Sequence, residues 1–407
     1  MKSIKKEKKQ DTYYVNEPGI IFKTTLRGVI KVGFRLILNV RSKRNPDIEQ
    51  LEGATILLGN HVSAIDPFLM GAYVTKKWVH YITSSSYFEY PSLKKLLEYV
   101  GAIPKRQGVP DIRSTRMAIS VLKNNGTVGL FPEGGRTIDG SMLPFNTSAA
   151  KLIKQTNSNV VISHINGASI SLPRWYRGVS GGYRRGRIEH KAYMLFTKEQ
   201  ISNLNVSQID EKIREALYYN EYDWQRENKV KFHSNSMAEG MHSILHKCPS
   251  CLHDYSMDSK KDKLFCTNCG NTAIVDKYGL INPQSEKDVV YPDMVIWRKW
   301  QNSILCKEIA DKDFSMHFEG SLDVKDSFGK IIEVHPNCQL DINVKEIVYT
   351  YPKGVINLSF YSITDAVCDY SLRFEINQEH NSYQFTPTNG QVVVKIIYTI
   401  KCIKGIL

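Results

Sequence analysis

The residues with the clearest capacity for chemistry are His61 and Asp66, within the stretch Asn-His-Val-Ser-Ala-Ile-Asp-Pro at residues 60–67. An imidazole can act as a general base when a carboxylate fixes its tautomer and supports its charge. In a regular helix these side chains would point about 140° apart, because each residue turns by about 100°. We therefore expect residues 61–66 to form a turn or an irregular helix start. Pro67 favours this by biasing Asp66 away from helical backbone.

A second stretch, Phe-Pro-Glu-Gly-Gly-Arg-Thr at residues 131–137, follows later in the chain. Each stretch comes directly after a short apolar run that is typical of a buried strand, at residues 55–58 and 127–131. Functional groups of α/β proteins lie at such strand ends. Taken alone, each stretch is more often a capped turn or a loop. Their occurrence together and in this order favours one site of chemistry.

At these residues the sequence resembles the glycerolipid acyltransferase family, which includes the 1-acylglycerol-3-phosphate acyltransferases. Four blocks match over residues 17–228: H-x4-D at His61 and Asp66, Gly-Ala-Ile-Pro-Lys-Arg at 101–106, the stretch at 131–137, and Val-Val-Ile-Ser-His-Ile-Asn-Gly at 160–167. Gly135, Thr137 and Ser163 stand where the family usually has threonine, serine and proline. The resemblance implies an α/β fold and acyl transfer.

The implied reaction moves an acyl group from acyl-CoA or an acylated carrier protein directly to a hydroxyl. His61 is the implied general base, and Asp66 orients it. Arg106 and Arg136 are the implied ligands of an acceptor phosphate, because a guanidinium can pair with two phosphate oxygens. The weaker candidate for this role is Lys105. In the third block, Glu133 is expected to hold the Arg136 loop or to bind the acceptor, with Gly134 beside it.

The implied acceptor is the lysophospholipid 1-acylglycerol-3-phosphate, in phospholipid biosynthesis. Glycerol-3-phosphate, a lysophospholipid with a larger headgroup and an acylated amino-acid lipid are the alternatives among acceptors. A non-catalytic binding protein that combines a zinc ribbon with an inactive acyltransferase fold is the alternative from another class. For His164 in the fourth block we favour a structural role.

Positive charge is concentrated in the part of the chain that carries these blocks. The 407 residues have a formal net charge of +13, with 42% hydrophobic and 23% charged residues, which is ordinary for a folded protein of two or three domains. Residues 1–228 hold 34 Lys and Arg against 20 Asp and Glu, or +14, and the remaining residues sum to −1. Such a surface could attract nucleic acid, anionic lipid or polyanionic cofactors, and charge alone does not choose among them. Substrate phosphates and anionic lipid suffice to explain it, and no nucleic acid partner is expected.

A peripheral association with a membrane is expected. The sequence has no run of about 20 apolar residues that could span a bilayer, and residues 1–6 lack the apolar core of a signal peptide. We therefore expect a cytoplasmic protein on the inner face of the membrane. Residues 19–40 place Lys23, Arg27, Lys31 and Arg35 on a broad apolar helix, which predicts contact with anionic lipid, assisted by the lysines of residues 2–9. The alternative is a helix packed on the protein with a solvated basic face.

Two C-x2-C pairs, fourteen residues apart, are formed by Cys248, Cys251, Cys266 and Cys269. This spacing is typical of a zinc ribbon, in which four thiolates bind a structural zinc ion. A disulfide framework is less expected in a cytoplasmic protein. The remaining cysteines, at positions 306, 338, 368 and 402, are expected to be buried thiols.

The predicted fold class is α/β, with a mixed sheet covered by helices, followed by a zinc ribbon and a small β-rich domain. Apolar runs alternate with amphipathic stretches over residues 45–200, and helices are expected at 92–100, 114–122 and 209–222. Strands are expected near 314–322, 355–360 and 371–376. The expected segments are 1–44 for membrane contact, 45–228 for catalysis, 229–246 as a linker, 247–283 as the ribbon and 284–407 as a β-rich accessory domain.

Overall fold

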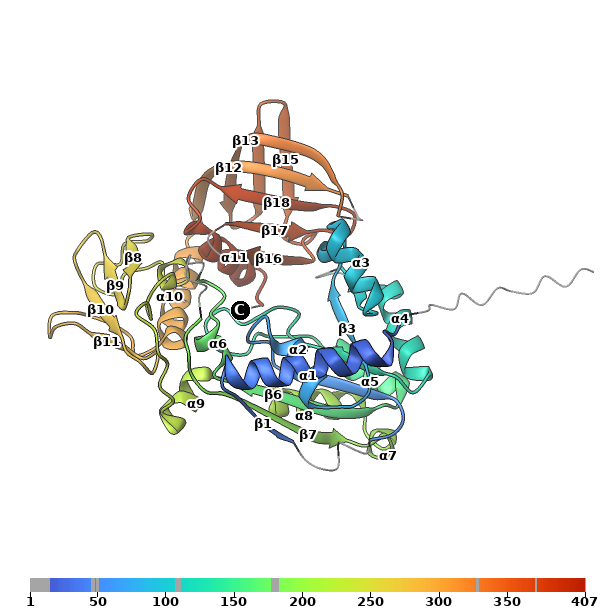
Figure 1. The fold of residues 1–407 in the computed structure, drawn as a ribbon. Coiled ribbons are helices and arrows are strands. Elements are labelled where there is room, and N and C mark those ends of the chain that lie inside the picture. Colours follow the sequence, from blue (N-terminus) through green and yellow to red (C-terminus); the bar gives the residue numbers. More distant parts are fainter. Residues whose placement is uncertain are drawn as a thin grey trace, which may run out of the picture.

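The computed structural model describes residues 15–44, 48, 51–106, 111–176, 183–326, 329–369 and 372–406. The expected lysine-rich segment at residues 2–9 lies outside these ranges. Figure 1 shows a large sheet with helices at the bottom, a small sheet at the left and a third sheet at the top. This arrangement confirms the predicted fold class.

The first sheet is mixed, with strand order β1-β7-β6-β2-β5-β3-β4. Its strands are β1 (Val40–Arg44), β2 (Thr55–Gly59), β3 (Val79–Ser84), β4 (Ile103–Lys105), β5 (Thr127–Leu130), β6 (Asn159–Asn166) and β7 (Ile188–Phe196). Neighbouring strands are parallel except for β6 with β7. The C-terminal ends of β2 and β5 therefore lie side by side, and the residues that follow them meet at one edge of the sheet.

Helices cover both faces of this sheet. They are α2 (Asp66–Tyr73), α3 (Pro91–Tyr99), α4 (Ile112–Lys123), α5 (Ser148–Thr156), α6 (Ala168–Ser171), α7 (Lys198–Ser202), α8 (Val206–Leu217) and α9 (Glu221–Asn228), with a 3-10 turn η2 (Ser85–Glu89). Apolar residues of α4, α5 and α8 share a core with Ile56 and Leu58 of β2. On the other face, α2 shares a core with Leu57. The single helix expected at 209–222 is instead α8 and α9, because Asn220 caps a new helix.

Helix α1 (Ile20–Leu36) turns much of its basic stripe towards the protein. Arg27 donates hydrogen bonds to the carbonyls of Gly71, Lys76 and Lys77 at 3.4, 3.1 and 3.2 Å. Lys31 lies 5.8 Å from the ring centroid of Tyr73.

The outward face of α1 is mainly apolar. The exposed fractions are 81% for Ile21, 64% for Val29, 60% for Val32 and 69% for Leu36. The helix thus packs on the protein as the alternative expects, but Arg27 and Lys31 of its basic face turn inward while Arg35 is exposed. Within the described ranges, no helix has both the length and the apolar character needed to cross a bilayer.

The second sheet is antiparallel, with order β11-β10-β9-β8. Its strands are β8 (Met257–Lys260), β9 (Lys263–Cys266), β10 (Thr272–Val275) and β11 (Ile281–Pro283). This sheet shares a core with α10 (Met294–Ile309), whose Trp297 is fully buried. Residues 229–246, which include the 3-10 turn η3 (Met241–Ser243), contribute Phe232, Met241 and Ile244 to the same core. They are thus more buried than the expected linker would be.

The third sheet is antiparallel, with order β15-β14-β13-β12-β18-β17-β16. Its strands are β12 (Ser315–Lys325), β13 (Ile331–Asn343), β14 (Glu346–Tyr351), β15 (Gly354–Ser359), β16 (Asp365–Asp369), β17 (Arg373–Asn377) and β18 (Ser382–Pro387). Helix α11 (Val392–Ile403) packs on this sheet through Val393, Ile396 and Ile400. The expected strands correspond to β12, β15 and β17, whereas α10 and α11 were not predicted.

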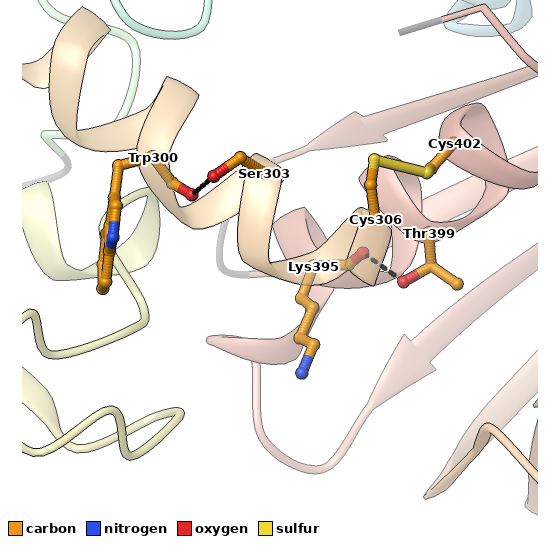
Figure 2. Close-up of a disulfide and its surroundings, with 6 residues drawn as sticks. All are labelled: Trp300, Ser303, Cys306, Lys395, Thr399 and Cys402. Carbon is orange, nitrogen blue, oxygen red and sulfur yellow. Dashed lines mark hydrogen bonds between the residues drawn. A yellow bond between two sulfur atoms is a disulfide. The ribbon is translucent and has the colours of Figure 1, made fainter. Parts of the chain in front are cut away.

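A disulfide joins α10 to α11 (Figure 2), between Cys306 and Cys402, whose Cα atoms are 6.3 Å apart. The expectation of a buried thiol is wrong for these two residues, while Cys338 and Cys368 are free. The two bonded cysteines are 96 residues apart in the chain. Their pairing therefore depends on the packing of α10 against α11.

Candidate active site

His61 and Asp66 meet in the turn between β2 and α2. Their Nδ1 and Oδ2 atoms are 2.9 Å apart, and Asp66 is fully buried whereas 20% of the His61 side chain is exposed. Residues 63–65 form the bend and turn that the spacing predicts. Helix α2 begins at Asp66, so the expected bias of Asp66 away from helical backbone is wrong. Pro67 is tolerated there because the first turn of a helix needs no N–H at that position.

The Asp66 carboxylate is held by donors from three consecutive residues. Besides His61, the backbone N–H groups of Val62 and Ser63 donate to Oδ2 at 2.7 and 2.8 Å, and the Ser63 hydroxyl donates to Oδ1. These hydrogen bonds compensate for the hydration that a buried carboxylate loses. When Nδ1–H of His61 donates to this carboxylate, Nε2 carries the lone pair and is the basic nitrogen.

The stretch at 131–137 holds the backbone of His61 on both sides. Glu133 Oε1 accepts a hydrogen bond from the His61 N–H at 2.8 Å, and the Thr137 N–H donates to the His61 carbonyl at 2.8 Å. The Phe131 ring stacks on the imidazole with centroids 4.2 Å apart. Glu133 Oε2 accepts from the Leu143 N–H at 2.7 Å, so this side chain also ties down the following loop. These contacts support a loop-holding role for Glu133.

Glu133 titrates far from its ordinary range. Burial raises the pKa of Glu133 to about 8, and the negative charge of Asp66 acts in the same direction. The hydrogen bonds from Leu143 and His61 oppose this shift because they stabilise the carboxylate. The group that fixes the His61 backbone is therefore sensitive to pH in the neutral range.

A cavity of about 1850 Å³ opens at His61. Four further candidates from the sequence line it: Lys105, Glu133, Gly134 and Arg136. Gly134 has φ of +67°, a backbone conformation that favours glycine, and so allows the tight turn before Arg136.

Arg106, unlike these four candidates, is directed away from the cavity and towards the third sheet. Its Nη2 donates to the backbone carbonyl of Glu379 at 3.2 Å, in the turn between β17 and β18. Arg106 is not among the residues that line the cavity in the described structure. With the exception of Arg106, the expected site residues thus line the same cavity as His61 or contact His61 directly.

The remaining walls of the cavity come from distant parts of the chain. An apolar wall is built from α1, α2, α3 and the start of β3, and includes Leu26, Phe68, Trp78, Leu93 and Leu97. A polar wall comes from the third sheet and α11, and includes Asp365, Arg373 and Lys401. Sequence reasoning missed the polar wall because no local pattern marks residues that become close only through the packing of two domains.

The fourth block supports the sheet behind the site. Ser163 Oγ and Ser42 Oγ lie 2.9 and 2.8 Å from the two ring nitrogens of His190. Burial lowers the pKa of His190 to about 3, so the ring is neutral. His164 Nε2 lies 3.1 Å from the carbonyl of Tyr218, and burial lowers its pKa as well. These contacts agree with a structural role for His164.

A buried ion pair ties the loop after Thr137 to the C-terminal helices. Asp139 accepts a hydrogen bond from Arg298 Nε of α10, and Arg298 Nη1 donates to the Tyr398 hydroxyl of α11 at 3.1 Å. Asp139 also accepts from the Ser141 N–H at 3.0 Å. No sequence pattern predicts this contact, because its partners are 159 residues apart.

Four cysteine thiols form a cluster in the ribbon: Cys248, Cys251, Cys266 and Cys269, with Sγ atoms within 4.8 Å of one another. Two of the Sγ–Sγ distances, Cys248 to Cys269 and Cys251 to Cys266, are 3.7 Å. A tetrahedral zinc with Zn–S bonds of about 2.3 Å requires sulfur atoms about 3.8 Å apart. The cluster therefore fits a zinc ribbon. Four protein ligands leave no position for a substrate, which indicates a structural metal.

An ion network connects the ribbon to α10 and α11. Lys247, beside the first cysteine, lies 3.0 Å from both Asp254 and Glu308. Lys395 of α11 lies 2.7 and 3.2 Å from the same two carboxylates. Both lysine side chains are less than 10% exposed. Removing one member of such a buried network leaves an uncompensated charge, which is strongly destabilising.

Residues 39–166 match the family model described as Acyltransferase. This finding confirms the resemblance that the sequence blocks indicate and supports an acyltransferase. Among solved structures, the chain is similar to the 1-acyl-sn-glycerophosphate (LPA) acyltransferase PlsC from Thermotoga maritima. That similarity has 20% sequence identity and a TM-score of 0.39, and it covers 47% of this chain and 77% of that one.

We predict that Glu133→Gln reduces the pH dependence of thermal stability. The pKa of Glu133 is higher in the folded protein than in the unfolded chain, so its contribution to stability is complete below about 4.5 and is lost as pH rises through about 8. The melting temperature of the wild type should therefore fall between pH 6 and 9, by on the order of 5 °C. In calorimetry, the melting temperature of the variant should fall less steeply with pH. Glu221, whose pKa burial raises to about 7, accounts for the pH dependence that remains in the variant. Parallel slopes would contradict the prediction.

We predict that zinc removal loosens the ribbon without disturbing the edge of the sheet that carries His61. A bound metal stabilises only the folded site, so chelation should speed amide hydrogen exchange in β8–β11. The strands β2 and β5, which share no ligand with the metal, serve as the internal control. Cys269→Ser should reproduce the effect of chelation. A ribbon with equal protection in the presence and absence of metal would show that the four thiols do not bind zinc.

Proposed function

We propose that this protein transfers a fatty acyl group from acyl-CoA or acyl-carrier protein to the hydroxyl of 1-acylglycerol-3-phosphate. The observation that carries the proposal is the buried Asp66 carboxylate 2.9 Å from Nδ1 of a cavity-lining His61. His61 Nε2 takes the proton of the acceptor hydroxyl while the oxygen of that hydroxyl attacks the thioester carbonyl. The C–S bond then breaks, and the leaving thiolate takes the proton back from the imidazolium.

A phosphate-bearing acceptor is supported by cationic side chains near the base. Arg136 and Lys105 line the cavity with His61, and a guanidinium can pair with two phosphate oxygens. Arg106, the other expected phosphate ligand, donates to the Glu379 carbonyl in this structure. We therefore assign phosphate binding to Arg136 and Lys105.

The cavity is large enough for two substrates. Its volume of about 1850 Å³ exceeds the roughly 300–1,000 Å³ of most small-molecule sites. The apolar wall that includes Leu26, Phe68 and Trp78 suits fatty acyl chains, because burying each methylene contributes about 0.8 kcal/mol. A donor and a lipid acceptor could thus meet at His61.

We further propose that α1 rests in the interface of a membrane. Its outward face exposes Ile21, Val29, Val32 and Leu36, and soluble monomers rarely expose apolar patches of this kind. The inner face of the same helix contributes Leu26 and other side chains to the cavity wall. A lipid acceptor could therefore pass from the bilayer to His61 along this helix.

A basic groove beside the end of α1 supports a preference for anionic lipid. The segments that contain Arg185 and His233 run side by side and pair at these two residues. In both segments exposed positions alternate with buried ones such as Phe232, so the exposed side chains share one face. The groove is lined by Arg41, Arg185, Arg187, Lys229, Lys231 and His233, together with neutral residues such as Asn39. No Asp or Glu is among the described residues that line the groove, and Glu189 lies beside it, 3.0 Å from Arg187. The groove therefore carries net positive charge.

The inner-face, cytoplasmic location expected from the sequence is part of this proposal. In a reducing compartment the bond between Cys306 and Cys402 would be transient, because stable disulfides are rare there.

The deciding experiment measures thiol release from acyl-CoA and acyl-carrier protein with lysophosphatidate, glycerol-3-phosphate and neutral monoacylglycerol as acceptors. We predict acceptor-dependent release that His61→Ala reduces by at least about 100-fold, because general base catalysis typically contributes that much. Melting temperature should change little, since the His61 backbone makes the contacts that hold the loop.

A matched control is available in His317→Ala. His317 also pairs with a carboxylate, that of Asp341, but it lies on the third sheet and does not line the cavity. This variant should keep full activity. No acceptor-dependent release from the wild type with any donor would reject the proposed reaction and favour the binding-protein alternative.

Membrane contact is tested by co-sedimentation with vesicles that contain about one third anionic lipid. We predict that Val32→Glu weakens binding at least about tenfold, because it places a charge on the inserted face. Val355→Glu, at a similarly exposed apolar residue of the third sheet, should bind normally. Lys231→Gln should weaken binding only at low salt, where surface charges are least screened. Equal binding by Val32→Glu and wild type would exclude α1 as the contact.

A further inference from the structure

The third sheet and α11 are part of the cavity that contains His61. Asp365 of β16, Arg373 of β17 and Lys401 of α11 line the same cavity as His61 and Arg136. This part of the chain lies outside the region that matches the acyltransferase family. It therefore contributes groups that the family match does not explain.

Three contacts fix this part of the chain against the first sheet and its loops. The Asp139 carboxylate binds Arg298 of α10, which in turn binds the Tyr398 hydroxyl of α11. Arg174 Nη2 donates to the Cys368 carbonyl of β16 at 3.0 Å, and Arg106 donates to the Glu379 carbonyl. The wall formed by β16, β17 and α11 is thus fixed at three points.

Because Arg106 contacts the third sheet, Lys105 and not Arg106 faces the cavity at the end of β4. Its guanidinium is directed to the turn between β17 and β18, while its neighbour Lys105 lines the cavity. Lys401 lines the cavity from the other domain. The domain that engages Arg106 therefore also supplies a cation of its own.

The charges of Asp365 and the neighbouring lysines act on one another. Burial raises the pKa of Asp365, and the positive charges of Lys401, Lys105 and Lys404 act in the opposite direction. Lys404 donates to the carbonyls of Phe360 and Ile363 at 2.7 and 2.8 Å. Lys105 and Lys401 are the cations of this cluster that also line the cavity. The carboxylates of Asp365 and Asp111, which both act on Lys105, line it as well.

From this arrangement we infer that Lys401 of α11 binds the anionic headgroup of the acyl acceptor, together with Lys105 on the opposite wall. The inference rests on the proposed function in naming the acceptor as a phosphate-bearing lipid. It gives the C-terminal domain a direct part in substrate recognition. An ammonium group contributes through charge and donates hydrogen bonds, and charge-assisted bonds of this kind are among the stronger ones in proteins.

The test compares binding of short-chain lysophosphatidate and of monoacylglycerol with the same chain. It uses the full-length protein with His61→Ala, so that no turnover interferes. Adding Lys401→Gln should weaken lysophosphatidate binding at least about tenfold, in line with a lost hydrogen bond to a charged group. Binding of monoacylglycerol should not change, and Lys401→Arg should restore most of the affinity for lysophosphatidate.

Lys353→Gln is the matched control, because it removes the same charge from the exposed turn between β14 and β15, away from the cavity. Unchanged lysophosphatidate affinity with Lys401→Gln, or an equal loss for both ligands, would overturn the inference. If Lys401 controls binding but the wild type transfers no acyl group, the inference stands and the proposed reaction fails. If the protein binds no lysophosphatidate, both are rejected.

Discussion

The hydrogen bonds that hold His61 are the constraint on which the rest of the site depends. Asp66 fixes the ring, while Glu133 and Thr137 fix the backbone N–H and carbonyl of the same residue. These partners come from the ends of β2 and β5, which are parallel neighbours in the sheet. A shift of either strand would therefore move the base or its support. The same arrangement buries the Glu133 carboxyl, which is the main cause of its raised pKa, and the nearby Asp66 carboxylate adds to that shift.

Much of this site could be predicted from the sequence because its chemistry is local. The interval between His61 and Asp66 requires a turn, and the apolar runs before both stretches indicate parallel strands whose ends meet. The cysteine spacing predicts the ribbon for the same reason: each C-x2-C pair is a local unit. Even so, the sequence could not assign Glu133 to the His61 backbone, since that requires the register of two strands.

The features that sequence reasoning missed depend on packing between distant segments. Residues 392–403 are rich in β-branched residues and suggest a strand, yet they form α11, because burial against the third sheet and α10 outweighs intrinsic preference. The contact of Arg106 with Glu379 spans 273 residues, and that of Cys306 with Cys402 spans 96. The periodicity of α1 indicated an amphipathic helix but not which face packs inward. The orientation of α1 depends on the backbone carbonyls of Gly71, Lys76 and Lys77, which accept hydrogen bonds from the Arg27 guanidinium.

Helix α11 joins the three parts of the molecule, because contacts from each part act at different points along it. Lys395 near its start enters the ion network of the ribbon, Tyr398 binds the Arg298 that pairs with Asp139, and Cys402 at its end is bonded to α10. Ile397 and Lys401, which lie between these points, line the cavity. No described residue of the ribbon strands β8–β11 lines that cavity. The ribbon can therefore influence the site through the position of this helix, and also through the core that it shares with the cavity-lining Ile138. The folding of the ribbon, whose four thiols suit a structural metal, thereby affects the position of α11 and the cavity wall that this helix forms.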